Sequence, residues 1–205
     1  MSVRVKICGL TNVDDAMAAA EAGADALGFV LYKESPRCIP SAQAQDIVRS
    51  LPPFVTTVGL FVNQPTQWVR VIADRCGVDT LQFQGDETPA YCEGFAQRAI
   101  KAIRVKDRAS LEIMASYRVR AFVLDAYREG EYGGTGQTFD WDLAVAAKAH
   151  GRIILAGGLT PDNVAEAIRR VRPFAVDVSS GVEGSTKGVK DHGKIRAFIQ
   201  AAKGA

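Results

Sequence analysis

The chain has 205 residues, of which 47% are hydrophobic and 23% are charged, and its formal net charge is +2. This composition is ordinary for a folded globular protein and excludes the disordered and fibrous classes. The net charge is small, the basic residues are scattered, and no nucleic-acid-binding motif is present, which argues against a nucleic-acid partner. No apolar run approaches the ~20 residues that span a bilayer and no signal-peptide segment is visible, so we expect a cytoplasmic protein with no membrane partner.

The first predicted strand has one apolar face and one reactive face. Apolar side chains alternate with polar or reactive ones over residues 3–8, the period of a strand. Lys6 and Cys8 fall on the same face, and in a closed barrel the other face would meet the surrounding helices. Thr11 or Asn12 can cap the helix that follows.

Strands and helices then alternate along the whole chain. We expect strands at residues 24–31, 54–62, 80–83, 99–105, 121–124, 153–156 and 174–178, and helices at 41–51, 65–75, 88–97, 107–116, 139–149, from 160 onward, and at 191–202. Parallel strands need crossovers of a dozen or more residues, usually helices, so this rhythm indicates a parallel sheet. Eight such units in about 200 residues predict an α/β fold, the (β/α)8 or TIM barrel. Because no linker interrupts them, we expect one domain over residues 1–205.

Glycine loops follow the last two predicted strands. Gly157 and Gly158 precede a helix that Thr160 and Pro161 are expected to begin, and Ser180 and Gly181 follow the next strand. Glycines let backbone N–H groups approach an anion closely, and helix N-termini add positive charge. One such loop would more simply be a tight turn, but two in succession favour a phosphate site between them.

A third glycine-dense segment, GEYGGTGQ at residues 130–137, precedes the sixth helix. It could be a flexible surface loop, but its position next to the predicted site favours a lid or a wall for the substrate. It is not a Walker-type phosphate loop, because no GK[ST] follows it.

Barrel active sites lie at the C-terminal ends of the strands, which selects the candidate residues. Cys8 ends the first strand, Asp125 ends the sixth, and Asp177 lies near the end of the eighth; Arg37 lies in the loop after the second. A buried ammonium on Lys6 needs a carboxylate partner, and either Asp125 or Asp177 could supply it.

Two of these residues could exchange protons with a substrate. A free cysteine is most often a small buried apolar residue, but a thiol beside a lysine can have its pKa lowered and act as base or nucleophile; we expect that role for Cys8, although burial alone would raise the pKa. Asp125 could simply cap a loop. However, a carboxyl that faces a thiol in an apolar cavity would form with it an acid and a base with separated pKa values.

The remaining cysteines and histidines do not suggest a metal or a disulfide framework. We interpret Cys38, Cys76 and Cys92 as structural, since they are far apart in a loop or on helices. His150 and His192 fall near a helix end and a helix start, which disfavours a metal centre or a Ser/His/Asp triad.

Seven segments match one known family. They are KICGLT at 6–11, SPR at 35–37, VGLFVN at 58–63, LQFQGDE at 81–87, GGTGQTFDW at 133–141, LAGGLTPDNV at 155–164 and DVSSGVE at 177–183. Over almost its full length the chain resembles the phosphoribosylanthranilate isomerases. The resemblance implies an Amadori rearrangement of N-(5'-phosphoribosyl)anthranilate, a phosphorylated small-molecule substrate, by a monomer or homodimer without cofactor or metal.

The resemblance also implies roles for individual residues. Asp125 would be the general acid that protonates the ring oxygen, and Cys8 would be the thiolate base that removes the C2' proton. Arg37 would hold the anthranilate carboxylate, and Asp177 would contact the ribose. The phosphate would lie on the two loops, and the residues assigned to it are Gly157, Gly158, Ser180 and Gly181.

The sequence departs from the family's usual pattern at two places, and two other functions would share some of its features. The family usually has His where this chain has Gln84, and often Pro-Gly at 187–188 where it has Lys-Gly; a glutamine cannot titrate, so position 84 is not a proton shuttle. A sugar-phosphate epimerase would share the glycine loops, but many such enzymes need a metal with His and Asp ligands. A non-enzymatic module that binds phosphorylated metabolites would make Cys8 dispensable.

Overall fold

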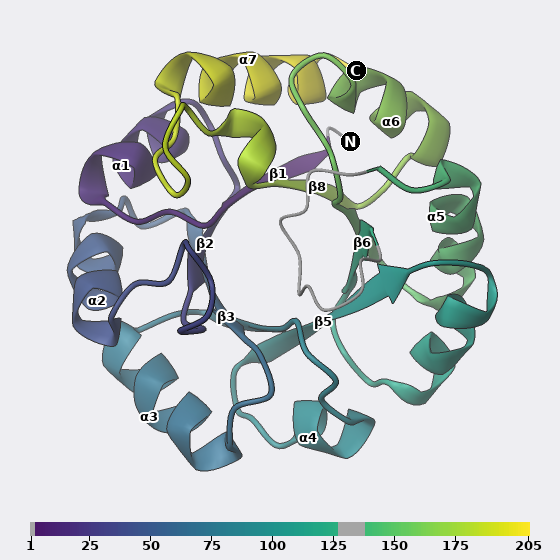
Figure 1. Ribbon diagram of the computed structural model, residues 1–205, viewed down its shortest axis with the longest axis horizontal. Helices are drawn as coiled ribbons and strands as arrows, with labels where there is room; N and C mark the ends of the chain where they lie inside the picture. Colours follow the sequence, from purple (N-terminus) through teal and green to yellow (C-terminus); the bar gives the residue numbers. More distant parts are fainter. Residues whose placement is uncertain (1–2, 127–137) are drawn as a thin grey trace.

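The computed structural model describes residues 3–126 and 138–205. Eight parallel strands close into a barrel in which the last strand pairs with the first (Figure 1). The strands are β1 (Arg4–Cys8), β2 (Ala26–Val30), β3 (Thr56–Phe61), β4 (Thr80–Phe83), β5 (Arg98–Val105), β6 (Phe122–Ala126), β7 (Ile153–Leu155) and β8 (Ala175–Val178). The predicted (β/α)8 barrel is confirmed.

A ring of helices surrounds the strands. The α-helices are α1 (Val13–Glu21), α2 (Ser41–Ser50), α3 (Thr66–Cys76), α4 (Pro89–Glu93), α5 (Trp141–Ala147), α6 (Val164–Val171) and α7 (His192–Lys203), and the 3₁₀ helices are η1 (Ala109–Ser116), η2 (Lys148–His150) and η3 (Ser180–Val182). In the part of the chain that the structure describes, no helix is long and apolar enough to cross a membrane.

The two faces of β1 lie as their alternation predicts. Val5 and Ile7 are fully buried in the apolar layer between the barrel and the helices. Lys6 and Cys8 point the other way, and Cys8 packs with Val30 and Leu60 at the barrel mouth. The first helix is capped by Asn12, whose side-chain oxygen accepts a hydrogen bond from the Asp15 N–H at 2.7 Å.

Three predicted helices are wrong in type or bounds. The fifth, expected at 107–116, is the 3₁₀ helix η1, because its buried residues Leu111 and Met114 are three apart, the repeat of a three-residue turn. The fourth, expected at 88–97, is α4, which ends before Gly94. The helix expected from Thr160 begins only at Val164, since the Asn163 side chain accepts from the Thr160 N–H at 2.8 Å and closes a separate turn.

Candidate active site

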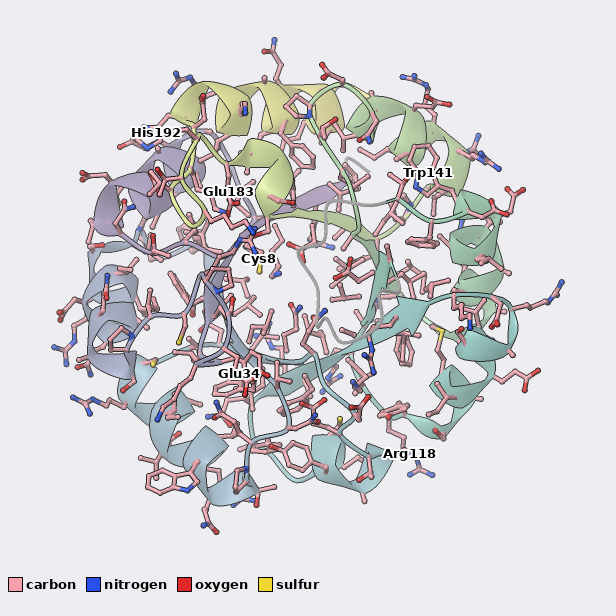
Figure 2. All side chains as sticks on the ribbon, viewed as in Figure 1. Cys8, Glu34, Arg118, Trp141, Glu183 and His192 are labelled. Carbon is pink, nitrogen blue, oxygen red and sulfur yellow. The ribbon has the colours of Figure 1, made fainter. Side chains whose placement is uncertain are left out.

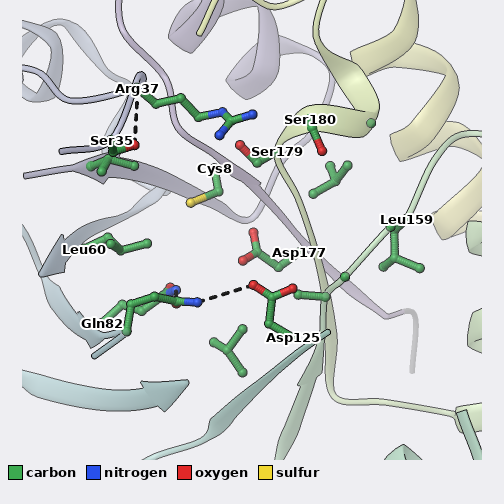
Figure 3. Close-up of a pocket in the computed structure, with 18 of the residues that line it drawn as sticks. Cys8, Ser35, Arg37, Leu60, Gln82, Asp125, Leu159, Asp177, Ser179 and Ser180 are labelled. Atoms are coloured by element: carbon green, nitrogen blue, oxygen red, sulfur yellow. Dashed lines mark hydrogen bonds between the residues drawn. The ribbon is translucent and has the colours of Figure 1, made fainter. Parts of the chain in front are cut away.

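A cavity opens at the C-terminal end of the barrel, where all the predicted site residues in the described chain meet. Its lining includes the residues predicted from the strand ends and from the two loops, namely Cys8, Arg37, Asp125, Gly157, Gly158, Asp177, Ser180 and Gly181. Cys8, Arg37, Asp125 and Asp177 surround the opening in the close-up view (Figure 3). The predicted lid at 130–137 lies outside the described residues.

The carboxylate partner of Lys6 is Asp177. Its Nζ donates to Asp177 Oδ2 at 2.8 Å, and both side chains are less than 10% exposed. Register decides between the two carboxylates, because Lys6 and Asp177 are direct neighbours across the β1–β8 pair that closes the barrel. The other oxygen of Asp177, Oδ1, is buried without a hydrogen-bond partner among the described residues.

The expected lowering of the Cys8 pKa is wrong. Burial raises the pKa of the Cys8 thiol above its ordinary value of 9.0, and the charge of Asp177 adds to the rise, while the Lys6 ammonium opposes it without cancelling it. Burial also lowers the pKa of Lys6, but the charges of Asp177 and Cys8 outweigh this effect, so the pKa is raised and Lys6 stays protonated. The Cys8 thiol can therefore lose its proton only against the cost of burial.

Asp125 has the raised pKa expected of a general acid. Burial and the charge of Asp177 raise it to about 6, although hydrogen bonds from the Ala126 N–H and from Gln84 oppose the shift. Ala126 N donates to Oδ1 at 2.9 Å and Gln84 Nε2 donates to Oδ2 at 3.3 Å. Gln84 Oε1 in turn accepts from Gln82 Nε2 at 2.8 Å. The acid thus ends a chain of two amides.

Arg37 is held by a carboxylate that sequence reasoning did not single out. Its Nε donates to Glu183 Oε1 at 2.6 Å and its Nη2 donates to Oε2 at 2.9 Å. Lys190 Nζ also donates to Glu183 Oε1, at 3.1 Å. Burial alone would raise the pKa of Glu183, but the two cations outweigh it and the pKa is lowered. The guanidinium is therefore fixed along one edge, and Nη1 takes part in neither of these bonds.

The two glycine loops touch each other. Gly157 and Gly158 have φ of 80° and 62°, left-handed values that favour glycine. A Cβ on Gly181 would stand 1.9 Å from the Leu159 carbonyl oxygen, so the loop after β8 packs directly on the loop after β7. The predicted juxtaposition of the loops is present, and both line the cavity.

The residues that the sequence analysis missed are Gln82, Glu183 and Lys190. A sequence signal was present for Gln82 of β4, because Gln84 follows it by two residues, the period at which strand side chains point the same way. Glu183 lies in the matched segment DVSSGVE, but its contact with Arg37 spans 146 residues of sequence, and no local pattern predicts such a pairing.

The other cysteines and histidines lie away from the cavity lining. Cys76 and Cys92 are buried on helices, and the side chain of His192 pairs with Asp15 at 2.8 Å. Figure 2 shows His192 at the outer edge of the ring and Cys8 near its centre. Within residues 3–126 and 138–205, no group of three or more His, Cys, Asp or Glu side chains is placed to hold a metal.

Comparisons with known proteins agree on one family. The family model described as N-(5'phosphoribosyl)anthranilate (PRA) isomerase matches residues 5–201. A protein of Geobacter sulfurreducens named N-(5'-phosphoribosyl)anthranilate isomerase is 58% identical over 98% of this chain and 99% of its own. A phosphoribosyl anthranilate isomerase solved with reduced 1-(o-carboxyphenylamino)-1-deoxyribulose 5-phosphate is 42% identical, with a TM-score of 0.89, over 99% of this chain and 100% of its own. Monomers generated from the dimeric Thermotoga maritima enzyme are 40% identical, with a TM-score of 0.89 and the same coverage.

Proposed function

Because this chain belongs to the N-(5'-phosphoribosyl)anthranilate isomerase family, we propose that Asp125 and Cys8 are the acid and the base of its reaction. The reaction is the Amadori rearrangement of N-(5'-phosphoribosyl)anthranilate to 1-(2-carboxyphenylamino)-1-deoxyribulose 5-phosphate in tryptophan biosynthesis. One observation carries the assignment: a carboxyl with a raised pKa and a thiol converge on one largely buried cavity from β6 and β1.

The proposed chemistry moves two protons. Asp125 gives its proton to the furanose ring oxygen as the bond from C1' to that oxygen breaks, and the lone pair of the anthranilate nitrogen forms the C=N bond of a Schiff base. The Cys8 thiolate then takes the C2' proton, and the freed electron pair forms the enolamine. Tautomerisation to the ketone completes the rearrangement. Lys6, paired with Asp177 at 2.8 Å, supplies the positive charge beside the thiolate.

Arg37 is the proposed partner of the anthranilate carboxylate. The edge formed by its Nε and Nη2 is taken by Glu183, so the carboxylate would be met at Nη1. The apolar side chains of Val30, Leu60 and Val62 line the same cavity and would pack against the aromatic ring. A fixed cation next to an apolar wall suits a benzoate, whose charge and ring lie side by side.

The phosphate and the ribose would occupy the opposite side of the cavity. We assign the phosphate to Gly157, Gly158, Ser180 and Gly181, since both loops line the cavity and glycines let backbone N–H groups approach an anion closely. Asp177 Oδ1, a buried acceptor without a partner in the described chain, would take a ribose hydroxyl. The proposal treats residues 1–205 as one catalytic domain and, from the biosynthetic role alone, places it in the cytoplasm.

The acid and base assignment is tested by Cys8→Ser and Asp125→Asn. General acid or base catalysis contributes about 10²- to 10⁴-fold, so kcat should fall at least about a hundredfold in each variant. Loss of anthranilate fluorescence from the substrate measures kcat, with spontaneous hydrolysis subtracted. Cys76→Ser is the matched control, a buried thiol on α3 outside the cavity. If Cys8→Ser keeps more than about a tenth of wild-type kcat, the base lies elsewhere.

For the oligomeric state, we favour the homodimer over the monomer. The Thermotoga maritima relative is described as dimeric. Here Phe54 is 97% exposed and lines a second cavity at the N-terminal end of the barrel, together with Ile154 and Phe174. A two-fold contact through this face would bury Phe54 in the partner. Sedimentation of the wild type and of Phe54→Glu decides: a dimer that the substitution dissociates supports the interface, and a monomeric wild type rejects it.

A further inference from the structure

Gln82 carries a buried carbonyl oxygen that the described chain leaves without a partner. The residue lies on β4, is 1% exposed and lines the active-site cavity. Its amide Nε2 donates to Gln84 at 2.8 Å, whereas Oε1 is fully buried and accepts no hydrogen bond from the described residues. Buried acceptors are nearly always paired, so an unpaired one inside a substrate cavity indicates that a ligand donor completes it.

The hydrogen-bond chain that contains Gln82 has a fixed direction. It runs from Gln82 Nε2 to Gln84 Oε1, at 2.8 Å, and from Gln84 Nε2 to Asp125 Oδ2, at 3.3 Å. Asp125 Oδ2 accepts from Gln84 and Gln84 Oε1 accepts from Gln82, so each amide turns its NH₂ group toward Asp125. The carbonyl at the far end of the chain, Gln82 Oε1, is the acceptor that remains.

Asp125 changes this chain when it acts as an acid. As it loses its proton, the bond from Gln84 becomes a charge-assisted one and strengthens. Linked hydrogen bonds polarise one another, and an amide that donates more strongly carries more negative charge on its oxygen. Gln82 Oε1 thus becomes a better acceptor at the moment when the substrate receives the proton.

Ring opening creates a donor at that same moment. The bond from C1' to the ring oxygen breaks, its electron pair stays on the oxygen, and the Asp125 proton joins it. An ether oxygen, which can only accept, becomes the 4'-hydroxyl, which can donate. We propose that Gln82 is a further substrate-contacting residue, whose Oε1 accepts the hydrogen bond of this newly formed hydroxyl. This step rests on the proposed function. The contact is absent in the closed ring, so it stabilises only the ring-opened species and favours kcat over KM.

The test crosses one change in the protein with one change in the ligand. The protein variant is Gln82→Met, which keeps the chain length but has no amide. The ligands are the reduced, non-reacting open-chain product analogue and its 4'-deoxy form. Wild type should bind the deoxy form about tenfold to a hundredfold more weakly, the range for a buried acceptor left unpaired. Gln82→Met should bind both forms equally, at the weaker level, and its kcat should fall by a similar factor.

Gln64→Met is the matched control. Gln64 is a second glutamine whose Oε1 has no partner in the described chain and whose Nε2 donates, at 2.7 Å, to the Leu31 carbonyl, but it lies outside the cavity lining. This variant should retain the discrimination between the two ligands. Equal binding of both forms by wild type overturns the proposal, and so does undiminished discrimination in Gln82→Met. The wild-type measurement does not depend on how a variant folds, and a wild type without isomerase activity would reject the proposed function instead.

Discussion

Two of the buried lysine–carboxylate pairs in the described part of the chain, Lys101–Glu87 and Lys6–Asp177, differ in how completely they are bonded. Lys101 Nζ lies 3.2 Å from Glu87 Oε2 and also donates to the carbonyls of Phe83, Gly85 and Ala102. Glu87 Oε1 accepts from two backbone N–H groups. In the other pair, Lys6 lies 2.8 Å from Asp177, whose Oδ1 has no partner in the described chain. Both pairs are less than 10% exposed, so burial alone does not distinguish them.

The difference teaches how to separate a structural ion pair from a functional one. A buried pair whose remaining lone pairs are all bonded holds strands and loops together, and no acceptor is left for a ligand. A buried pair with an unpaired oxygen facing a cavity carries a cost that a ligand can relieve. The Lys6–Asp177 pair is of the second kind, since Asp177 lines the cavity and its Oδ1 has no partner in the described chain. Gln82, although uncharged, resembles it in carrying an unpaired buried oxygen on a residue that lines the cavity.

The largest expected effect comes from removing the ammonium of the incomplete pair. Lys6→Met deletes the charge that opposes the burial of the Cys8 thiolate, so the Cys8 pKa should rise further and kcat should fall by about 10²-fold or more. Steady-state kinetics at several pH values measure both quantities. Wild-type kcat in this variant would show that the pair does not support the base.

Breaking the fully bonded pair, Lys101–Glu87, should lower the stability of the fold rather than the catalytic rate. Lys101→Met leaves Glu87 buried without its cation, which costs about 3–5 kcal/mol in the free energy of unfolding. The enzyme that stays folded should keep kcat within about threefold, since Lys101 does not line the cavity. Urea denaturation and active-site-normalised assays measure the two effects. A loss of activity comparable to that of Lys6→Met would erase the distinction between the pairs.

The pH profile sharpens the comparison without a mutation. In the proposed reaction Asp125 acts in its protonated form, with a pKa of about 6, and Cys8 acts as the thiolate, although burial raises the pKa of its thiol. The pKa of the base lies above that of the acid, so only a small fraction of the enzyme holds both groups in the active form between them. As the pH rises toward 6, more thiolate forms while Asp125 stays protonated, so kcat/KM rises. Between the two pKa values the gain of thiolate and the loss of protonated Asp125 cancel, so kcat/KM stays level. Above the Cys8 pKa only the loss of protonated Asp125 continues, so kcat/KM falls.

The measured profile of kcat/KM should therefore be a broad bell, with an acid limb at about pH 6 and an alkaline limb above pH 9. Lys101→Met should leave both limbs in place, whereas Lys6→Met should move the alkaline limb upward. A narrow optimum centred below pH 6 would contradict the assigned pKa order.

The smallest effect is expected at the buried pair of Arg37 with Glu183. Arg37→Lys keeps the positive charge but loses the planar edge that grips Glu183 and the nitrogen left for the substrate. KM should rise about tenfold while kcat stays within about threefold, because a binding contact is lost and the acid and base remain. An unchanged KM would place the anthranilate carboxylate elsewhere.

Local pattern was enough for the barrel and for the strand ends. Strand and helix periods predicted the eight units, and the C-terminal ends of the strands selected Cys8, Asp125 and Asp177 correctly as cavity residues. Local pattern did not predict which side chains pair across the closed barrel. The partner of Lys6 stayed open because the register of β1 against β8 joins residues 171 apart, and Glu183 was missed for the same reason.

Burial was the other quantity that the sequence did not contain. A lysine two residues from Cys8 predicted a lowered pKa, but the depth of the thiol in the barrel outweighs that neighbour. The start of α6 failed through local competition, because the Asn163 side chain closes a turn where Thr160 was expected to cap the helix. The first error concerns the surroundings of a residue in the fold, whereas the second concerns competition between residues that are neighbours in sequence.

The pairing of β8 with β1 has a consequence for how the enzyme is made. Lys6 and Cys8 come from the first strand to leave the ribosome, while Asp177, Ser180 and Gly181 belong to the last strand and the turn after it. In a growing chain that has completed only seven strands, Lys6 still lacks its partner Asp177, and the glycine loop after β7 lacks the loop that packs on it. During synthesis, catalytic competence therefore arrives in a single late event, when the final segment closes the ring.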